Sequence, residues 1–201
     1  MMAMATDSLD ADTADRLDMT RLATGDDGAL ESLMQRHGPA VYRLLLGLLQ
    51  DPEEACDLAQ ETFVRLYQAR GRFRSEDRLL PWLHTIALNL ARNRLRWRRR
   101  HPTVSWGTVD GASQEPASSL ELAASSEPSP LEQLQREERI RAVRQAVADL
   151  PPRLREVIVL CEWEERSQAE VATILRISPK AVESLLYRAR RILRARLHAW
   201  L

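Results

Sequence analysis

An arginine cluster is the feature of this sequence with the clearest chemistry. Six of the nine positions from 92 to 100 are arginine, within the segment ARNRLRWRRRH at 91–101. Guanidinium groups bind phosphate oxygens through paired hydrogen bonds, so the cluster indicates contact with nucleic acid. Composition alone leaves two other interpretations open, a nuclear-localisation signal and a well-solvated helix end.

The cluster continues a helix that we expect to begin near Pro81. At 100° per residue, one face of this helix is apolar and the opposite face is polar. The apolar face holds Leu83, Ile86, Ala87 and Leu90, and the polar stripe holds Thr85, Asn89, Arg92, Arg96 and Arg99. Because the stripe begins well before the cluster, the nucleic-acid interpretation is favoured. Trp97 is expected on the apolar side.

A second candidate for nucleic-acid binding is RSQAEVATILRISPKAVESLLYRARRILRARL at 166–197. Ser167 and Glu170 form an S-x-x-E capping box, and Ser178 followed by Pro179 starts another helix. A short helix, a tight turn and a longer basic helix predict a helix-turn-helix, whose second helix enters the major groove. An ordinary bundle with one basic helix is the alternative. The candidate DNA contacts on the second helix are Lys180, Glu183, Ser184, Tyr187, Arg188 and Arg191.

The pattern along the chain predicts an all-α protein, because no run of alternating residues indicates a sheet. Residues 103–130 are rich in Ser, Ala, Pro and Gly and contain no Lys or Arg, which is typical of a linker. We therefore expect two small helical domains joined by a flexible linker, the second a helix-turn-helix domain. The expected parts are an acidic flexible tail at 1–24, a first domain at 25–101, the linker at 102–131 and a second domain at 132–201.

Composition disfavours several other classes of protein. The 201 residues carry 29 basic and 29 acidic side chains, but 71–100 holds 9 basic and 2 acidic ones. No metal, nucleophile-elbow or phosphate-loop motif is found, so we expect no catalytic site, metal or cofactor. Cys56 and Cys161 lack metal or redox spacing and are expected as reduced thiols packed in helices. Without a signal peptide or a membrane span, the expected location is the cytoplasm.

Several stretches, in this order, resemble the extracytoplasmic-function group of bacterial sigma factors. They are DPEEACDLAQETFVRLY, RFRSEDRLLPWLHTIALNLARNRLR, LPPRLREVIVL and SQAEVATILRISPKAVESLLYRAR. The resemblance implies a transcription-initiation subunit that binds core RNA polymerase and promoter DNA and that an anti-sigma factor controls. It implies that the first domain, sigma region 2, reads the −10 element and the second, sigma region 4, reads the −35 element. No membrane or small-molecule substrate is implied.

The resemblance also assigns roles to residues. The −10 candidates, which would hold an unstacked base, are Phe73, Trp82, Asn89, Arg92, Asn93 and Arg96. The polymerase-binding candidates are Asp57, Gln60, Glu61 and Val64. The base-reading positions of the family match Glu183, Ser184, Tyr187 and Arg188. The chain departs from the family at Leu79, Leu80, Asn93, Glu183 and Leu185. Its preferred −10 and −35 bases therefore cannot be copied from another member of the family.

Two functions of other classes remain as alternatives. A stand-alone helix-turn-helix repressor or activator would bind a palindromic duplex without polymerase. An enzyme acting on nucleic acid would need clustered carboxylates or metal ligands, which the sequence does not display.

Overall fold

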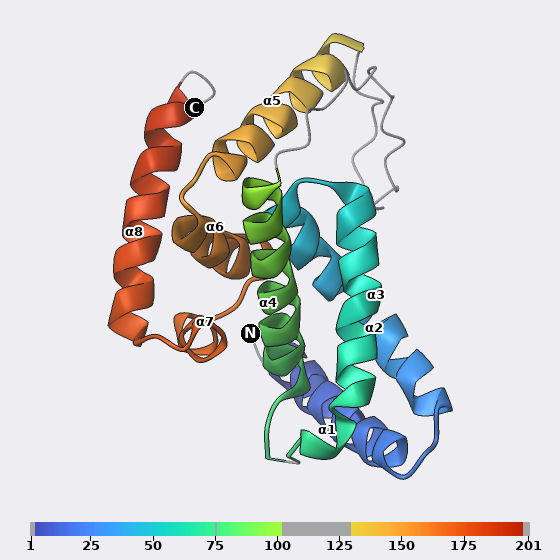
Figure 1. Cartoon of the computed structure of the whole chain (residues 1–201). Helices are drawn as coiled ribbons and strands as arrows, with labels where there is room; N and C mark the ends of the chain where they lie inside the picture. The colour runs from blue at the N-terminus through green and yellow to red at the C-terminus, as the bar shows by residue number, and fades with distance from the viewer. Residues whose placement is uncertain (1–2, 75, 102–129, 199–201) are drawn as a thin grey trace.

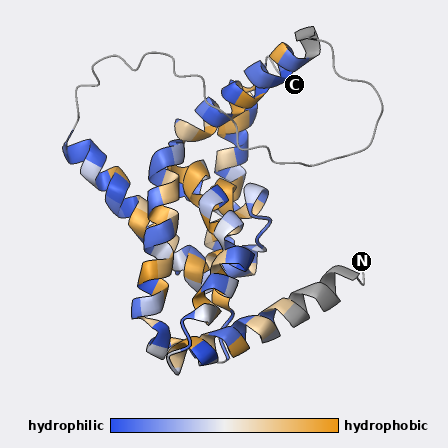
Figure 2. Ribbon diagram, turned by 90° about the vertical axis from the view of Figure 1, so that its right-hand side faces the viewer, coloured by the Kyte–Doolittle hydropathy of each residue, from blue (hydrophilic) through white to orange (hydrophobic). Residues whose placement is uncertain are grey.

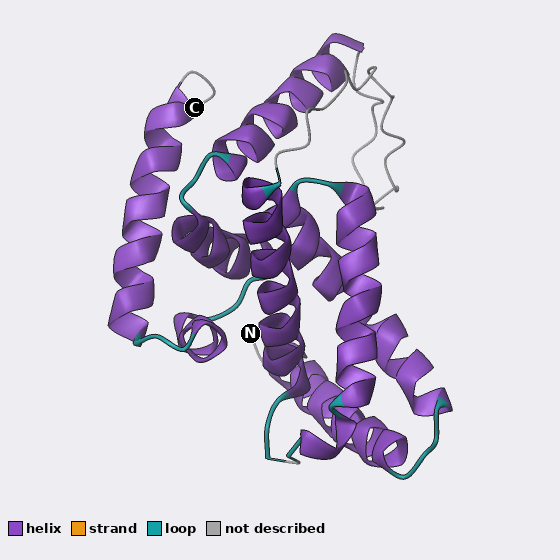
Figure 3. Cartoon of the chain, viewed as in Figure 1, coloured by secondary structure: helices purple, strands orange, loops and turns teal. Residues whose placement is uncertain are grey.

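The computed structural model describes residues 3–74, 76–101 and 130–198. Every regular element in these residues is helical, as Figure 3 shows, which confirms the predicted fold class. The first domain consists of α1 (Ala3–Ala23), α2 (Gly28–Leu49), α3 (Pro52–Gln68), the 3₁₀ turn η1 (Arg70–Arg72) and α4 (Leu79–Arg100). The second consists of α5 (Pro130–Ala148), α6 (Pro152–Ile158), the π-helical turn η2 (Val159–Trp163), α7 (Gln168–Leu175) and α8 (Pro179–Arg196). The predicted linker lies almost wholly outside the described residues.

Local sequence signals start the helices where they were expected. Asp51 has extended backbone angles and its carboxylate accepts the Glu54 N–H at 3.0 Å, so it caps α3. The capping box of α7 is complete: the Ser167 N–H donates to Glu170 Oε2 at 3.0 Å and the Ser167 hydroxyl accepts the Glu170 N–H at 3.3 Å. The Ser178 hydroxyl accepts the Ala181 N–H at 3.2 Å and caps α8. The predicted helix-turn-helix is thereby confirmed as α7 and α8.

The N-terminal segment differs from the predicted flexible tail. It forms α1, which packs against α2 and buries Met19 and Leu22. Two of its acids are also buried, because basic side chains of α2 pair with them. Asp15 Oδ1 accepts from Arg36 at 2.6 Å and lies 2.7 Å from His37 Nε2. The expectation of a tail was therefore wrong for this packed part, since acidic composition alone does not show which acids have partners.

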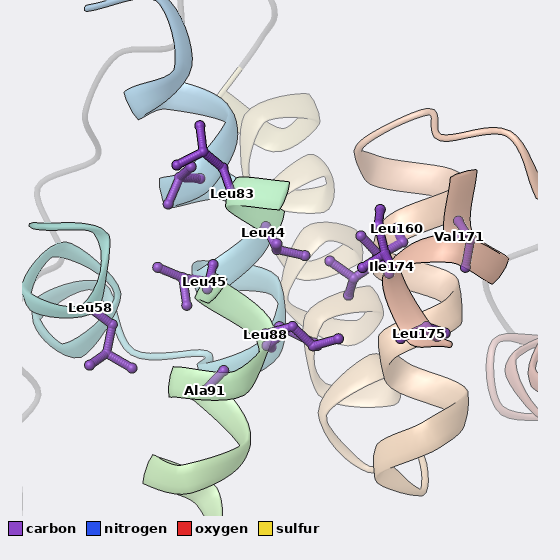
Figure 4. Close-up of a cluster of buried hydrophobic side chains, with 14 of the residues drawn as sticks. Leu44, Leu45, Leu58, Leu83, Leu88, Ala91, Leu160, Val171, Ile174 and Leu175 are labelled. Atoms are coloured by element: carbon purple, nitrogen blue, oxygen red, sulfur yellow. The ribbon is translucent and has the colours of Figure 1, made fainter. Parts of the chain in front are cut away.

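The apolar core runs through both domains without interruption. Figure 4 shows Leu44 of α2 and Leu88 of α4 directed toward Leu160 and Ile174 of the second domain. All four side chains are at most 2% exposed. Figure 2 shows the same arrangement as hydrophobic residues on the inner sides of the helices. We call the surface where α2 and α4 meet α6, η2 and α7 the domain seam.

A glycine permits the close approach of two helices at the domain seam. A Cβ atom on Gly47 of α2 would lie 2.6 Å from two ring carbons of Trp163, closer than any real contact. Glycine inside a helix is unfavourable by about 0.5 to 1 kcal/mol relative to alanine. Its presence here is explained by the indole ring, which packs directly on the α2 backbone.

Candidate nucleic-acid interface

A cavity of about 480 Å³ lies between α3, η1 and α4. Trp82, Asn89 and Asn93 line it together, and Phe73 packs on Trp82 with ring centroids 5.5 Å apart. Aromatic faces stack with nucleobases, and amide side chains can hydrogen-bond to their edges. The structure therefore brings three of the six −10 candidates to one cavity with the chemistry for an extruded base, and a fourth, Phe73, packs on the tryptophan of its wall.

The cavity also contains residues that the sequence analysis missed. Arg65 and Gln68 of α3 and Arg72 of η1 line its other wall, and Ile86 of α4 lies beside Trp82. Arg65 and Gln68 are three residues apart, which places them on one face of α3, and Arg72 follows in η1. That spacing was a usable signal, but the sequence could not show that this face of α3 lies opposite α4.

Arg92 lies on a different face of α4 from the cavity. Its guanidinium makes two hydrogen bonds of 2.7 Å to both carboxylate oxygens of Glu156 in α6. Hydrogen bonding to this carboxylate raises the pKa of Arg92 above its usual value. Arg96 bonds instead to the side chain of Asn93 and the carbonyl of Arg92. The polar stripe predicted on α4 is thus divided between the −10 cavity and the second domain.

The rest of the arginine cluster has several structural roles. Arg94 and Arg98 both donate to Glu54 Oε1 at 3.1 Å, and Arg98 also reaches Asp51 at 2.9 Å. These bonds tie the C-terminal half of α4 to the beginning of α3. Trp97, expected on the apolar side, is 48% exposed and stacks on His101 instead.

The recognition helix α8 presents its predicted contacts to solvent. Val182, Leu186 and Ala189 are buried against the rest of the second domain. Tyr187 is 67% exposed and the other five candidates are exposed too. Within the part of the chain that the structure describes, none of these side chains has a hydrogen bond or ion pair. The exposed set is Lys180, Glu183, Ser184, Tyr187, Arg188 and Arg191.

Two basic residues toward the C-terminal half of α8 are engaged within the second domain. Arg190 binds Glu162 at 2.6 Å, and Arg196 lies 3.0 Å from Asp149. Because these two guanidinium groups are paired with carboxylates, fewer arginines of this helix are available to bind DNA.

The polymerase-binding candidates form one strip along α3. Asp57 and Gln60 are exposed, and Val64 is 46% exposed although it is apolar. Glu61 accepts from Arg65 at 2.6 Å, one turn along the helix. Since Arg65 also lines the −10 cavity, this ion pair links the strip to the cavity wall.

The described residues hold few features of other kinds of site. No group of three or more His, Cys, Asp or Glu side chains there is placed to hold a metal ion. None of the helices described is long and apolar enough to span a membrane. Both cysteines are free thiols; Cys161 is half-buried, which raises the pKa of its thiol. Cys56 is exposed, contrary to the expectation that it packs inside.

Comparison with known proteins gives consistent matches for both domains. Residues 33–101 match Sigma-70 region 2, and residues 140–193 match Sigma-70, region 4. The RNA polymerase sigma-H factor of Pseudomonas aeruginosa is 32% identical over 170 residues, which cover 85% of this chain and 86% of that protein. The RNA polymerase sigma factor CnrH of Cupriavidus metallidurans is 33% identical over 194 residues, 95% of this chain and 98% of the relative.

A solved structure shares the arrangement of both domains. The structure of CnrH in complex with the cytosolic domain of CnrY aligns with a TM-score of 0.68 at 28% identity. The alignment covers 92% of this chain and 98% of that chain.

Proposed function

The chain belongs to the extracytoplasmic-function group of RNA polymerase sigma factors and directs promoter-specific initiation of transcription, and we propose which of its surfaces performs each step. The cavity between α3 and α4 holds a base of the −10 element. The outer face of α8 reads the −35 element, and the strip on α3 binds core polymerase. The observation that carries this proposal is the gathering of Trp82, Asn89 and Asn93 around one cavity, with Phe73 packed on the Trp82 ring.

The cavity would act by holding a base that has left the DNA stack. Extruding a base costs a few kcal/mol, and that cost must be offset by new contacts. Trp82 supplies a stacking surface and Phe73 supports it, while Asn89 and Asn93 supply donors and acceptors for the base edge. Arg72 on the opposite wall is suited to a neighbouring phosphate, whereas Arg65 is already paired with Glu61.

The outer face of α8 would read duplex DNA in the major groove. Arg188 is suited to guanine through paired hydrogen bonds, and Glu183 to the amino group of cytosine. Lys180 and Arg191 lie at the two ends of the exposed face and suit phosphates, which position the helix. This division predicts that base preference depends on the middle of the face and affinity on its ends.

Two protein partners follow from the same proposal. The strip of Asp57, Gln60, Glu61 and Val64 offers acids around one exposed apolar side chain, which suits a helical partner with basic residues. The relative CnrH has been solved with the cytosolic domain of CnrY, and we propose that an anti-sigma protein likewise controls this chain. Because its partner is core polymerase, we place the protein in the cytoplasm, and we assign it no catalytic activity.

Reconstituted transcription tests the proposal. The full chain mixed with core polymerase and a library of promoter fragments is expected to yield defined run-off transcripts, and Asn89→Ala is expected to reduce them without reducing binding to core. Arg100→Ala, at an exposed position beyond the cavity, is the matched control. Duplex binding to a palindrome without core, and no transcript with it, would favour the stand-alone regulator instead.

A further inference from the structure

A second cavity, of about 380 Å³, lies between α4 and α6, and arginine dominates its polar lining. Figure 1 shows the two helices side by side, and the hydrogen bonds between Arg92 and Glu156 join them. Among the described residues that line this cavity, Glu156 is the one acid. The arginines are Arg92, Arg96 and Arg99 of α4 and Arg153 and Arg155 of α6. We call it the arginine cavity, since five guanidinium groups surround it with a single carboxylate.

That carboxylate is already engaged. Arg92 binds both oxygens of Glu156 at 2.7 Å, and Arg153 lies 3.7 Å from the same group. Glu156 is 4% exposed, so this pairing is shielded from solvent. One negative charge is thus shared by two arginines, and the lining as a whole keeps a large excess of positive charge.

The other three arginines have no ion pair within the described part of the chain. Arg96 bonds to the side chain of Asn93 and to a backbone carbonyl, and Arg155 donates to the Leu48 oxygen at 2.9 Å. Arg99 has no hydrogen bond there. Burial, with Arg99 as the next cause, lowers the pKa of Arg155. The guanidinium groups therefore repel one another, and an anion with several charges would relieve that repulsion.

The rest of the arginine cavity is apolar apart from one amide. Leu88, Leu95 and Pro152 line it together with the amide of Asn89. An apolar surface of this kind packs on the face of a ring, and an amide can bond to the edge of a nucleobase. The volume lies in the range of small-molecule sites, roughly 300 to 1,000 Å³. An inorganic anion would use the arginines but not this surface.

We propose that the arginine cavity binds a nucleoside polyphosphate. The base packs on the apolar surface beside Leu95 and bonds to Asn89, and the phosphates bind Arg96, Arg99 and Arg153. The arginine cavity shares one lining residue, Asn89, with the −10 cavity, and the two otherwise have separate walls. The site is therefore distinct from the surface proposed to hold a DNA base, and it would stand if that assignment failed.

Isothermal titration calorimetry of the full chain, without core polymerase or DNA, tests this site. The probes are guanosine mono-, di- and triphosphate and inorganic tripolyphosphate, all at one ionic strength. We expect affinity to rise with the number of phosphates on the nucleoside, because each adds negative charge for the arginines. The nucleoside triphosphate should bind roughly tenfold more tightly than tripolyphosphate, since the base adds apolar contact.

Two variants locate the ligand between the helices. Arg99→Ala on α4 and Arg153→Ala on α6 are each expected to weaken binding of the triphosphate roughly tenfold, the effect of one lost charge-assisted hydrogen bond. Both side chains are exposed, so the fold should be retained, and a thermal melt checks this. Arg100→Ala is the matched control, because Arg100 is exposed beside Arg99 but does not line the cavity. It should bind the triphosphate as the unaltered chain does.

Three outcomes would overturn the inference. They are no binding of guanosine triphosphate at concentrations up to about 1 mM, an equal loss in Arg100→Ala, and tripolyphosphate that binds as tightly as the nucleotide. If the nucleotide fails to bind while Arg99→Ala and Arg153→Ala weaken binding of a random single-stranded oligonucleotide, the cavity serves the DNA backbone instead. Run-off transcription is scored separately: nucleotide binding by a chain that yields no transcript with core would remove the proposed function and leave this site standing.

Discussion

The two candidate DNA surfaces differ in how much of each is already engaged within the protein. On α8, six exposed side chains have no partner among the described residues. On α4, Arg92 binds the second domain, and Arg96 makes a hydrogen bond to the side chain of Asn93. Arg94 and Arg98 bind the beginning of α3. The density of arginine therefore does not measure contact with DNA. An arginine is available for DNA only where no carboxylate of the same chain lies within hydrogen-bonding distance of it.

The surfaces also differ in shape, and this implies different ways of reading DNA. The α4 surface is hollowed by a cavity with an aromatic wall, which suits a single base. The α8 surface is the convex face of one helix, which suits the major groove of an intact duplex. The comparison predicts that single-strand and duplex binding can be impaired separately.

Trp82→Ala is the strongest test of that separation. We expect it to weaken binding of the −10 single strand by about 2 to 3 kcal/mol, roughly 30- to 150-fold, because the stacking surface is lost. Binding of a −35 duplex should not change. Equilibrium titrations with the two DNA probes measure both effects.

Trp97→Ala is the matched control for that experiment, since Trp97 is exposed on the same helix and stacks on His101 outside the cavity. A thermal melt of each variant shows whether the fold is retained. Equal losses for the two tryptophan variants would show that the cavity does not hold the base.

Arg188→Ala tests the α8 surface, and here we expect −35 recognition to change while −10 binding stays the same. We expect a loss of about 2 kcal/mol in discrimination at one position of the −35 element if the side chain reads a base pair. Binding of the −10 strand should stay the same. Selection from a randomised duplex library reports the discrimination directly, and an unchanged preference would reassign Arg188 to phosphate contact. Arg194→Ala, at an exposed position farther along α8, serves as the control.

Much of the fold could be predicted from the sequence because its signals are local. Capping residues such as Asp51, Ser167 and Ser178 satisfy N–H groups a few residues away, so their effect does not depend on the rest of the chain. The apolar spacing of α8 likewise places Val182 and Leu186 on one face of the helix, and both are buried. The −10 candidates on α4 and in the loop before it came instead from the family resemblance, and their role in DNA binding stays a prediction.

What could not be predicted depends on contacts between distant segments. The apolar spacing of α4 gave one buried face, yet Leu88 and His84 are buried on a second face that the helix-turn-helix domain covers. Arg92 was placed on the polar stripe because nothing near it in sequence indicates Glu156, which lies 64 residues away. The helical N-terminal segment was missed because its buried acids are paired with α2.

His84 makes the covered face of α4 sensitive to pH in a way that α8 is not. The ring is fully buried and neither nitrogen has a partner in the described structure. Burial, with Arg166 as the next cause, lowers its pKa to about 3; the other charged groups acting on it are His37, Glu170 and Arg43. Below pH 6.5 His84 is therefore protonated in the unfolded chain, whereas in the folded chain it stays neutral until the pH approaches 3.

Stability should accordingly fall with pH from 6.5 toward 3, by about 1.4 kcal/mol per pH unit. Between pH 7.5 and 5.5 we expect the free energy of unfolding to drop by about that amount, as measured by urea titration. His84→Leu should remove this drop. If the variant keeps the same pH dependence, another group is responsible and the seam is not the sensitive element.

Arg98→Ala is the smallest expected effect and separates structural arginines from DNA-binding ones. Its guanidinium bridges Asp51 and Glu54 at the start of α3, and the side chain is 34% exposed. Since the site is partly solvated, we expect a loss of about 1 kcal/mol in the free energy of unfolding. Binding of the −10 strand should be unchanged after correction for folded fraction, because the ion pairs turn the group away from the cavity. Arg96→Ala, two residues earlier on α4, where the side chain bonds to the cavity residue Asn93, should show the reverse: little change in stability and weaker DNA binding. If the two variants behaved alike, the assignment of these arginines to separate roles would be wrong.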